Sequence, residues 1–313
     1  MSTAVVIEEQ GLRDGFQNEA KCAPTDFKLA VIDALIEAGL RRIQVCSFVH
    51  PKYVPQMADA DQLARALKRS SRDGEEVIYS GLVLNLRGVT RALDTGLDHL
   101  AISLSASDTH SQKNTRKTLK EARAGFKEMV DLAKSQHVQV RGGIQCAFGC
   151  RYEGEIDQQV VLDLAKEHLD RGVDELALAD STGMAHPRQM FELLPTLLEL
   201  AEGKPVILHL HDTEGKAMAN VLAALQSGVR HFDTGIAGMG GCPYIESASG
   251  NLATEDLVHF VEQLGYSTGI DLNALLKPIE HVESFFGRTF SGKMGKLLSQ
   301  PALHVLSAPP SDQ

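Results

Sequence analysis

The segment Val206-Ile207-Leu208-His209-Leu210-His211-Asp212-Thr213 places a run of apolar residues directly before a His-x-His pair and a polar turn. Such a run predicts a buried strand. Residues two apart on a strand point to the same face, so His209 and His211 present two imidazoles side by side near its carboxyl end. Adjacent imidazoles suit a divalent metal ion, although an isolated His-x-His is more often a pair of ordinary histidines.

Seven further apolar runs precede and follow this segment, and helical patterns separate them. With residues 205–208, the expected strands are residues 4–8, 42–48, 77–83, 99–104, 138–146, 175–179 and 231–234. The expected helices are residues 25–39, 61–70, 88–96, 114–137, 156–172, 187–201, 214–228 and 253–265. Eight strands alternating with eight helices predict an α/β protein with a (β/α)8 TIM barrel. An open doubly wound sheet is the alternative, but no G-x-G-x-x-G follows the first strand.

We expect one catalytic barrel domain over residues 1–270 and a short helical extension over residues 271–313 that packs on the barrel. The chain has 313 residues, of which 43% are hydrophobic and 5% aromatic. Its net charge of −10 argues against a nucleic-acid binder, which needs a basic face. No apolar run is long enough to predict a membrane span. The first residues carry no signal-peptide or transit pattern, and five scattered cysteines do not resemble a disulfide framework, so we expect a cytoplasmic protein.

Polar residues follow several of the expected strands. The active site of a TIM barrel lies where the strands end, so these side chains should converge. Each alone has an ordinary interpretation, such as a helix cap. One carboxylate, two imidazoles and one amide, completed by water, would suit Mg²⁺ or Mn²⁺ better than a closed zinc site. The polar residues are Arg13, Asp14, Gln44, Ser47 and Asp180, and the expected metal ligands are Asp14, His209, His211 and Asn251.

Several motifs resemble those of the 3-hydroxy-3-methylglutaryl-CoA lyases, members of a metal-dependent barrel superfamily that also holds isopropylmalate, homocitrate and citramalate synthases. The R-D and H-x-H parts are shared across that superfamily, whereas the S-F-V-x-P-K and G-x-G-G-C-P-Y motifs are more specific to the lyases. The resemblance runs from about residue 4 to about residue 295. The motifs are residues 13–19 (RDGFQNE), 47–57 (SFVHPKYVPQM), 148–154 (FGCRYEG), 209–213 (HLHDT), 238–244 (GMGGCPY) and 248–256 (ASGNLATED).

The resemblance implies cleavage of a carbon–carbon bond in a 3-hydroxyacyl-CoA, giving acetyl-CoA and a 3-oxo acid such as acetoacetate, as in leucine degradation. The metal would chelate the substrate hydroxyl and its distal carboxylate. By resemblance, Asp14 removes the hydroxyl proton, assisted by Asp180. Arg13 stabilises the thioester enolate, and Cys242 on a glycine-rich loop protonates its carbon.

The resemblance also implies an acyl-CoA partner and a homo-oligomer, either a dimer or a tetramer. The residues expected to bind substrate or CoA are Gln17, Asn18, Lys21, Ser47 and Lys52. Arg288 and Lys293 are further candidates for the CoA phosphates, although surface cations of this kind are more often simply solvated.

Two positions depart from the lyase pattern. Gln44 stands where the lyases carry Glu, and Gln cannot ionise. Ala177 stands where the lyases tend to have Ser. We favour retained chemistry on a substrate with a different 3-substituent over an impaired enzyme. The alternatives are an acetyl-CoA-using synthase, against which the short C-terminal segment argues, and a non-catalytic metal- or CoA-binding protein.

Overall fold

The eight long strands of the computed structural model, which describes residues 3–67, 71–72, 75–241 and 250–300, close into one parallel barrel. Around the barrel the strands follow the order β1-β12-β11-β10-β7-β6-β5-β2. All eight correspond to strands expected from the sequence, so the predicted TIM barrel is confirmed. The strands are β1 (Val6–Glu9), β2 (Arg42–Ser47), β5 (Ile78–Val83), β6 (His99–Ser105), β7 (Gln139–Gln145), β10 (Glu175–Asp180), β11 (Val206–Leu210) and β12 (His231–Thr234).

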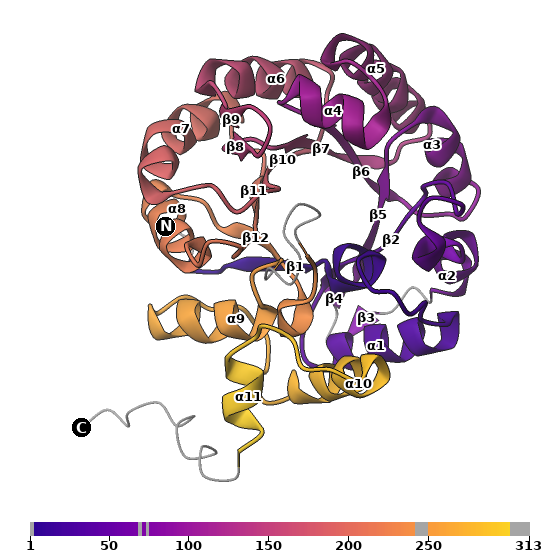
Figure 1. The fold of residues 1–313 in the computed structure, drawn as a ribbon, viewed down its shortest axis with the longest axis vertical. Coiled ribbons are helices and arrows are strands. Elements are labelled where there is room, and N and C mark those ends of the chain that lie inside the picture. The colour runs from indigo at the N-terminus through magenta and orange to yellow at the C-terminus, as the bar shows by residue number, and fades with distance from the viewer. Residues whose placement is uncertain (1–2, 68–70, 73–74, 242–249, 301–313) are drawn as a thin grey trace.

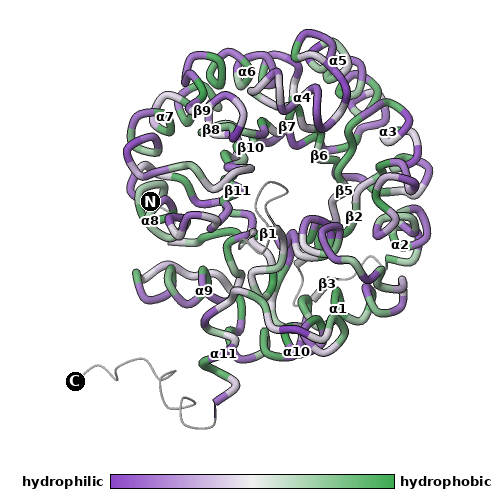
Figure 2. Tube along the Cα trace, viewed as in Figure 1, coloured by the Kyte–Doolittle hydropathy of each residue, from purple (hydrophilic) through white to green (hydrophobic). Residues whose placement is uncertain are grey.

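Helices form a ring around these strands (Figure 1). In Figure 2 hydrophilic and hydrophobic residues alternate along the outer helices, as expected of amphipathic helices that pack one face on a barrel. The helices of the ring are α1 (Thr25–Glu37), α2 (Ala60–Ala66), α3 (Leu86–Leu93), α4 (Asp108–Thr115), α5 (Leu119–Ser135), α6 (Gln158–Asp170), α7 (Pro187–Leu200), α8 (Ala217–Ser227) and α9 (Thr254–Gln263). No helix in the described part of the chain is both long and apolar enough to cross a membrane.

Alternation along the strands separates the core from the barrel interior. On β10, Leu176 and Leu178 belong to the hydrophobic core, whereas Ala177 and Ala179 line a cavity inside the barrel. On β7, Val140 belongs to the core and Arg141 lines that cavity. The period of two residues therefore directs one set of side chains to the helices and the other to the site.

The single helix expected over residues 114–137 is wrong: the structure has two helices there, α4 and α5. Arg116 adopts a left-handed conformation with φ 59°, which ends α4. Thr118 then begins α5 with a capping box, in which its side chain accepts from the Glu121 amide and the Glu121 side chain accepts from the Thr118 amide. The sequence signal was present as Thr-Leu-Lys-Glu, a capping-box pattern.

Two small hairpins and a tight turn were not expected from the sequence. The hairpins pair β3 (Ser71–Arg72) with β4 (Glu75–Glu76) and β8 (Gly149–Cys150) with β9 (Gly154–Glu155). The polar segment after β1, expected as a loop, folds into a π-helical turn, η1 (Gly11–Gly15), most of which is buried.

Residues that follow α9 pack back on the barrel. Helix α10 (Leu276–Phe286) lies against α1, where Phe285 stacks on Phe27 with ring centroids 4.2 Å apart. The short helix α11 (Met294–Leu298) contacts α9. The division into a barrel domain and an extension at residue 270 stays a prediction, and residues 301–313 lie outside the described part.

Candidate active site and metal centre

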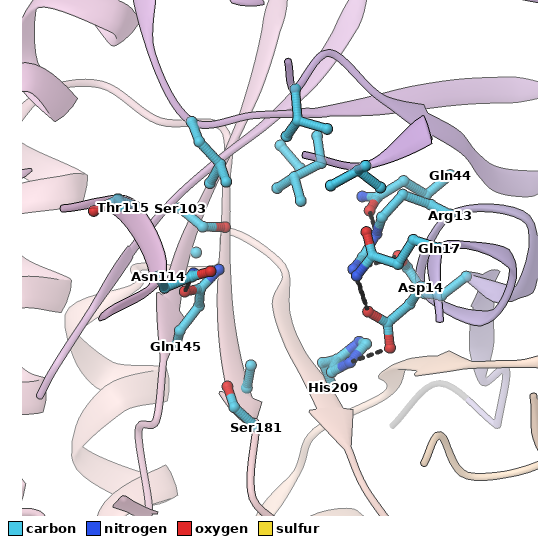
Figure 3. A pocket seen from close by; sticks show the side chains of 18 of the residues that line it. Arg13, Asp14, Gln17, Gln44, Ser103, Asn114, Thr115, Gln145, Ser181 and His209 are labelled. Atoms are coloured by element: carbon cyan, nitrogen blue, oxygen red, sulfur yellow. Dashed lines mark hydrogen bonds and ion pairs between the residues drawn. The ribbon is translucent and has the colours of Figure 1, made fainter. Parts of the chain in front are cut away.

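A cavity of about 810 Å³ opens at the carboxyl ends of the barrel strands. Figure 3 shows two facing walls, one carrying Arg13, Asp14, Gln17 and Gln44 and the other carrying Ser103, Asn114, Thr115 and Gln145. The structure brings most of the predicted site residues into this lining. The predicted residues that line the cavity are Arg13, Asp14, Gln17, Asn18, Gln44, His209 and His211.

The three predicted ligands from β11 and η1 meet in one buried group. The Asp14 Oδ2 atom lies 3.5 Å from His211 Nε2 and 3.8 Å from His209 Nε2. The two imidazole Nε2 atoms are 3.1 Å apart. All three separations lie below about 4 Å, the largest distance between two atoms that are each about 2 Å from a single ion, so one ion can contact all three residues.

Asn251, the fourth predicted ligand, lies beside this group. Its Nδ2 donates to Asp14 Oδ2 and to the Met239 carbonyl oxygen, each at 2.8 Å. Its Oδ1 is buried without a hydrogen-bond partner in the described chain. A buried carbonyl oxygen left unpaired is costly, and it is a ligand that hard divalent cations prefer. The four residues therefore fit a divalent metal ion.

A glycine lets the loop after β12 approach Asn251. Gly240 has φ +132°, and a Cβ atom there would lie 2.6 Å from Asn251 Nδ2. Only glycine fits this combination of backbone conformation and close contact. The glycine-rich motif thus holds the amide ligand in place, in addition to any mobility it gives the loop.

The electrostatics favour the protonation states that metal ligands need. Burial alone would raise the pKa of Asp14, but the Arg13 guanidinium and the two histidines outweigh it and hold this pKa well below its ordinary value. Burial lowers the pKa of His209, although Asp233 opposes the shift. Asp14 is therefore ionised and His209 neutral at pH 7, as metal binding requires.

The η1 turn places Arg13 and Asp14 next to each other at the cavity. The backbone amides of Arg13 and Asp14 both donate to the Gln10 carbonyl oxygen, at 3.0 and 2.7 Å. Gly15 packs so closely on Met239 that a Cβ atom would lie 2.8 Å from the Met239 Cβ. The Arg-Asp-Gly sequence is thus needed for the turn as well as for its two charged side chains.

Three side chains hold the Arg13 guanidinium. Its Nε donates to Gln44 Oε1 at 2.6 Å, its Nη2 donates to Gln10 Oε1 at 3.1 Å, and its Nη1 donates to Asp14 Oδ1. Sequence reasoning identified Gln44 but missed Gln10, which precedes the turn and carries no motif signal.

A buried carboxylate supports the metal group from β12. Asp233 Oδ2 accepts from His209 Nδ1 at 3.1 Å, so the other ring nitrogen of His209 is turned to the metal group. Both Nη atoms of Arg141 donate to the Asp233 carboxylate, and the Nη1–Oδ1 distance is 3.0 Å. Arg141 also lies 3.3 Å from Glu8 Oε2. The available signal was a charged residue inside each of two expected strands, Arg141 in β7 and Asp233 in β12.

Asp180 is buried at the end of β10 and does not belong to the cavity lining. Its carboxylate accepts from the backbone amides of Met184 and Ala185, at 3.0 and 3.2 Å. Burial raises its pKa to about 6. Asp180 thus holds the loop before α7 and lies close enough to His211 for their charges to interact.

The residues predicted to bind CoA fall into two groups. Gln17 and Asn18 lie on the cavity wall, whereas Lys21, Ser47 and Lys52 are outside its lining. Lys21 Nζ donates to the Phe285 carbonyl oxygen at 2.7 Å, which explains why it does not reach the cavity.

Three other cations lie at the mouth, at and just after the end of α4: Lys113, Arg116 and Lys117, here called the cationic lip. None of the three has an ion pair with an acidic residue in the described ranges. The Arg116 guanidinium lies 5.3 Å from the Tyr53 ring centroid, and the Lys113 ammonium lies 4.4 Å from that of Tyr152. The further CoA candidates pair elsewhere: Arg288 with Glu19, and Lys293 near Asp212 and Asp256. The predicted proton donor Cys242 lies outside the described residues.

A second buried carboxylate lies beneath the turn η3 (Ile236–Gly238), which begins the glycine-rich loop. Glu255 Oε2 accepts from the Ala237 amide at 3.0 Å, while Oε1 is buried without a partner in the described residues. Burial, with the neighbouring Asp256 and Glu9 carboxylates, raises the pKa of Glu255 to about 8. The folded protein therefore binds this proton more tightly than the unfolded chain does. The corresponding stability is complete below pH 4.5 and is lost as the pH rises through 8.

We therefore expect the stability of the Glu255→Gln variant to decrease less between pH 5 and pH 9 than that of the unsubstituted protein. Its Tm at pH 9 should exceed that of the unsubstituted protein by at least about 2 °C, because no charge has to be buried. Calorimetry at pH 5.5, 7 and 9 checks this, with the exposed Glu199→Gln on α7 as the control. Parallel Tm curves for all three proteins would contradict it.

Comparison with known proteins agrees with the resemblance seen in the motifs. A family model described as HMGL-like matches residues 4–282. The chain is 37% identical to the hydroxymethylglutaryl-CoA lyase YngG of Bacillus subtilis, over 97% of this chain and 98% of that protein. It is also 37% identical to the cytoplasmic 3-hydroxy-3-methylglutaryl-CoA lyase of Mus musculus, over 93% and 84%. A solved HMG-CoA lyase from Acinetobacter baumannii, in complex with coenzyme A and 3-methylmalate, superposes with a TM-score of 0.90 at 36% identity, covering 100% of this chain and 99% of that one.

Proposed function

The chain belongs to the HMGL-like family, and on this premise we propose that it is a divalent-metal-dependent carbon–carbon lyase acting on 3-hydroxy-3-methylglutaryl-CoA or a close analogue. The products are acetyl-CoA and a 3-oxo acid, which is acetoacetate for the 3-methyl substrate. The observation that carries this proposal is the convergence, in one cavity, of Asp14, His209 and His211 with the Arg13 guanidinium. Asn251, whose Oδ1 is unpaired in the described chain, is hydrogen-bonded to Asp14 beside them.

Asp14, His209, His211 and Asn251 would hold a divalent ion such as Mg²⁺ or Mn²⁺, which would lower the pKa of the substrate hydroxyl and orient it. The hydroxyl proton is removed, the C2–C3 bond breaks, C3 becomes a ketone, and the electron pair forms the thioester enolate. Arg13 lies beside the ligand Asp14 and stabilises the enolate oxygen, an effect worth about 10²–10³ in rate for comparable donors. Proton transfer by Asp14 or Asp180, and return of a proton to C2 by Cys242, remain predictions from the family resemblance.

We assign the phosphates of the CoA partner to the cationic lip in place of Lys52, Arg288 and Lys293. The lip cations form no close ion pair in the described chain, where Lys117 has only a longer-range interaction with Glu121, and they border the cavity, so their charge is available to an anionic ligand. Gln17 and Asn18, on the opposite wall, remain candidates for contacts with the acyl-CoA.

We expect the triple substitution of Lys113, Arg116 and Lys117 by Ala to raise KM for the acyl-CoA about tenfold or more, with a smaller change in kcat. The salt dependence of kcat/KM should weaken, because fewer protein cations interact with the CoA phosphates. Steady-state kinetics at two ionic strengths measures both effects. The matched control replaces three exposed cations of the outer helices, Lys127, Lys166 and Arg188, by Ala; equal KM increases in the two triple variants would contradict the assignment.

The function is tested by incubating the purified protein with 3-hydroxy-3-alkylglutaryl-CoA esters and Mg²⁺ or Mn²⁺ and measuring acetyl-CoA. The lyase function is supported if acetyl-CoA is released, if a chelator abolishes the release and if added metal restores it. No turnover of any ester despite metal binding rejects it. If acetyl-CoA and a 2-oxo acid condense in the same preparation, the synthase alternative is correct, and CoA binding without either reaction supports a non-catalytic protein.

Three further assignments accompany this proposal. A cytoplasmic location fits the free thiols of the four described cysteines, since disulfides are rare there. Assembly into a dimer or tetramer is testable by light scattering. A role in leucine degradation depends on the 3-methyl ester being the preferred substrate.

A further inference from the structure

Two neutral amides hold the Arg13 guanidinium: Gln10, directly after β1, and Gln44 on β2. Arginine carries only N–H donors, so each amide must turn its oxygen to Arg13, as the Nε–Oε1 and Nη2–Oε1 contacts show. This fixes the orientation of both amides, because a flipped amide would place its own N–H₂ group against the guanidinium.

The two amide nitrogens are consequently directed away from Arg13. Gln10 is 0% exposed, and its Nε2 has no hydrogen-bond partner among the described residues. Gln10 and Gln44 both line the cavity, and Figure 3 shows the Gln44 amide nitrogen pointing toward its interior. A buried N–H donor without an acceptor is costly in the free protein, which indicates an acceptor supplied by a ligand.

The charges around the cavity select the kind of acceptor. Asp14 and Asp233 are the acidic residues in the described lining, and both are engaged, the first by Arg13 and the histidines of the metal group and the second by Arg141. Asp14 is the acidic partner of Arg13 in the described lining, and the two glutamines are neutral, so they add no further negative charge beside the guanidinium. The lip adds three further cations to the same lining.

We propose that Gln10 Nε2, Gln44 Nε2 and Arg13 form a carboxylate subsite, so that the preferred acyl-CoA carries a carboxylate on the carbinol carbon where 3-hydroxy-3-methylglutaryl-CoA carries a methyl group. This rests on the proposed lyase function and names its substrate class. A glutamate at position 44 would pair with Arg13 and repel that carboxylate, whereas glutamine donates to it. Position 44 thus determines which 3-substituent is accepted. The small Ala101, Gly143 and Ala177 leave room for it in the same cavity.

The kinetic test compares two esters that differ only at this substituent, 3-carboxy-3-hydroxyglutaryl-CoA and 3-hydroxy-3-methylglutaryl-CoA. We expect kcat/KM to favour the carboxy ester at least about tenfold, since charge-assisted hydrogen bonds distinguish the two groups. Gln44→Glu should reverse this ratio, and Gln10→Met should reduce it. Gln145→Glu adds the same charge on the opposite wall and should change the ratio less than about threefold. Cleavage of the methyl ester with no preference for the carboxy ester overturns the subsite and leaves the lyase function intact.

A binding test separates the subsite from catalysis. Tricarballylate and 3-methylglutarate differ by the same carboxylate-for-methyl exchange and lack the reacting hydroxyl. Calorimetric titration of the metal-loaded protein should give at least about tenfold tighter binding of tricarballylate, with the difference lost in Gln44→Glu. Equal binding of the two acids by the unsubstituted protein overturns the proposal even if neither ester is cleaved, and the comparison needs no variant to fold.

Discussion

Substitution of His211 by Ala is expected to lower kcat about 10³-fold at saturating metal and to weaken Mn²⁺ binding by about 100-fold or more. His211 Nε2 lies 3.1 Å from His209 Nε2 and 3.5 Å from Asp14 Oδ2, so its removal takes away one of the four side chains proposed to define the metal position. The remaining three side chains cannot fix an ion against Arg13 at the distance that enolate stabilisation needs.

Mn²⁺ binding measured by electron paramagnetic resonance, together with steady-state kinetics over a range of metal concentrations, checks this expectation. His137→Asn is the matched control, because His137 is exposed at the end of the helix–strand connection before β7. If His211→Ala bound Mn²⁺ as tightly as the unsubstituted protein, the assignment of the metal centre to this group would be wrong. A lowered kcat with intact metal binding would instead indicate a direct role for the imidazole in proton transfer.

The barrel could be predicted because each of its strands carries a local signal. A short apolar run bounded by turn residues predicts a buried strand wherever it occurs, and all eight expected runs are barrel strands. The error at residues 114–137 arose at a boundary, where the expected helix began before the left-handed Arg116 and so ran across the capping box at Thr118. Periodicity reports burial, whereas helix ends depend on single backbone conformations.

The site residues show the same difference between those with a local sequence signal and those without one. His209 and His211 could be paired from the sequence because the strand period places them on one face, and Asp14 and Asn251 could be added from the motifs. The residues that hold Arg13 and His209 in place could not be found in that way. Arg141 and Asp233 act on partners from other strands, and their contacts depend on strand order and register rather than on any spacing along the chain. Gln10 lies only three residues before Arg13, but their contact depends on the buried turn η1, which was not expected from the sequence. The lip depends on the turn that ends α4, which the sequence interpretation had placed inside a helix.

Among the residues that support the metal ligands, Asp233 is expected to have the largest effect on metal affinity and stability when it is substituted. The effect depends on the residue that replaces it. Substitution of Asp233 by Asn keeps the shape of the side chain but removes the charge that binds Arg141 and fixes the His209 tautomer. We expect Mn²⁺ affinity to fall about 10- to 100-fold, the range typical of carboxylates that support metal-bound histidines. Substitution by Ala should in addition destabilise the fold by about 3–5 kcal/mol, because it leaves the buried Arg141 without its main partner.

The comparison of the two variants separates support of the metal from support of the fold. Mn²⁺ titration and thermal unfolding of the metal-free proteins should place Asp233→Asn well below the unsubstituted protein in affinity and between it and Asp233→Ala in stability, because the amide oxygen still accepts from Arg141 but carries no charge. A double substitution, Asp233→Leu with Arg141→Met, removes both charges of this pair and should be more stable than Asp233→Ala without recovering affinity, while Glu8 loses Arg141 as one of its partners. Recovery of both would mean that Asp233 serves the fold alone. Unchanged Mn²⁺ affinity in Asp233→Asn would mean that His209 is held by its strand and not by the carboxylate, because the Nδ1 contact would then contribute nothing to the orientation of the ring.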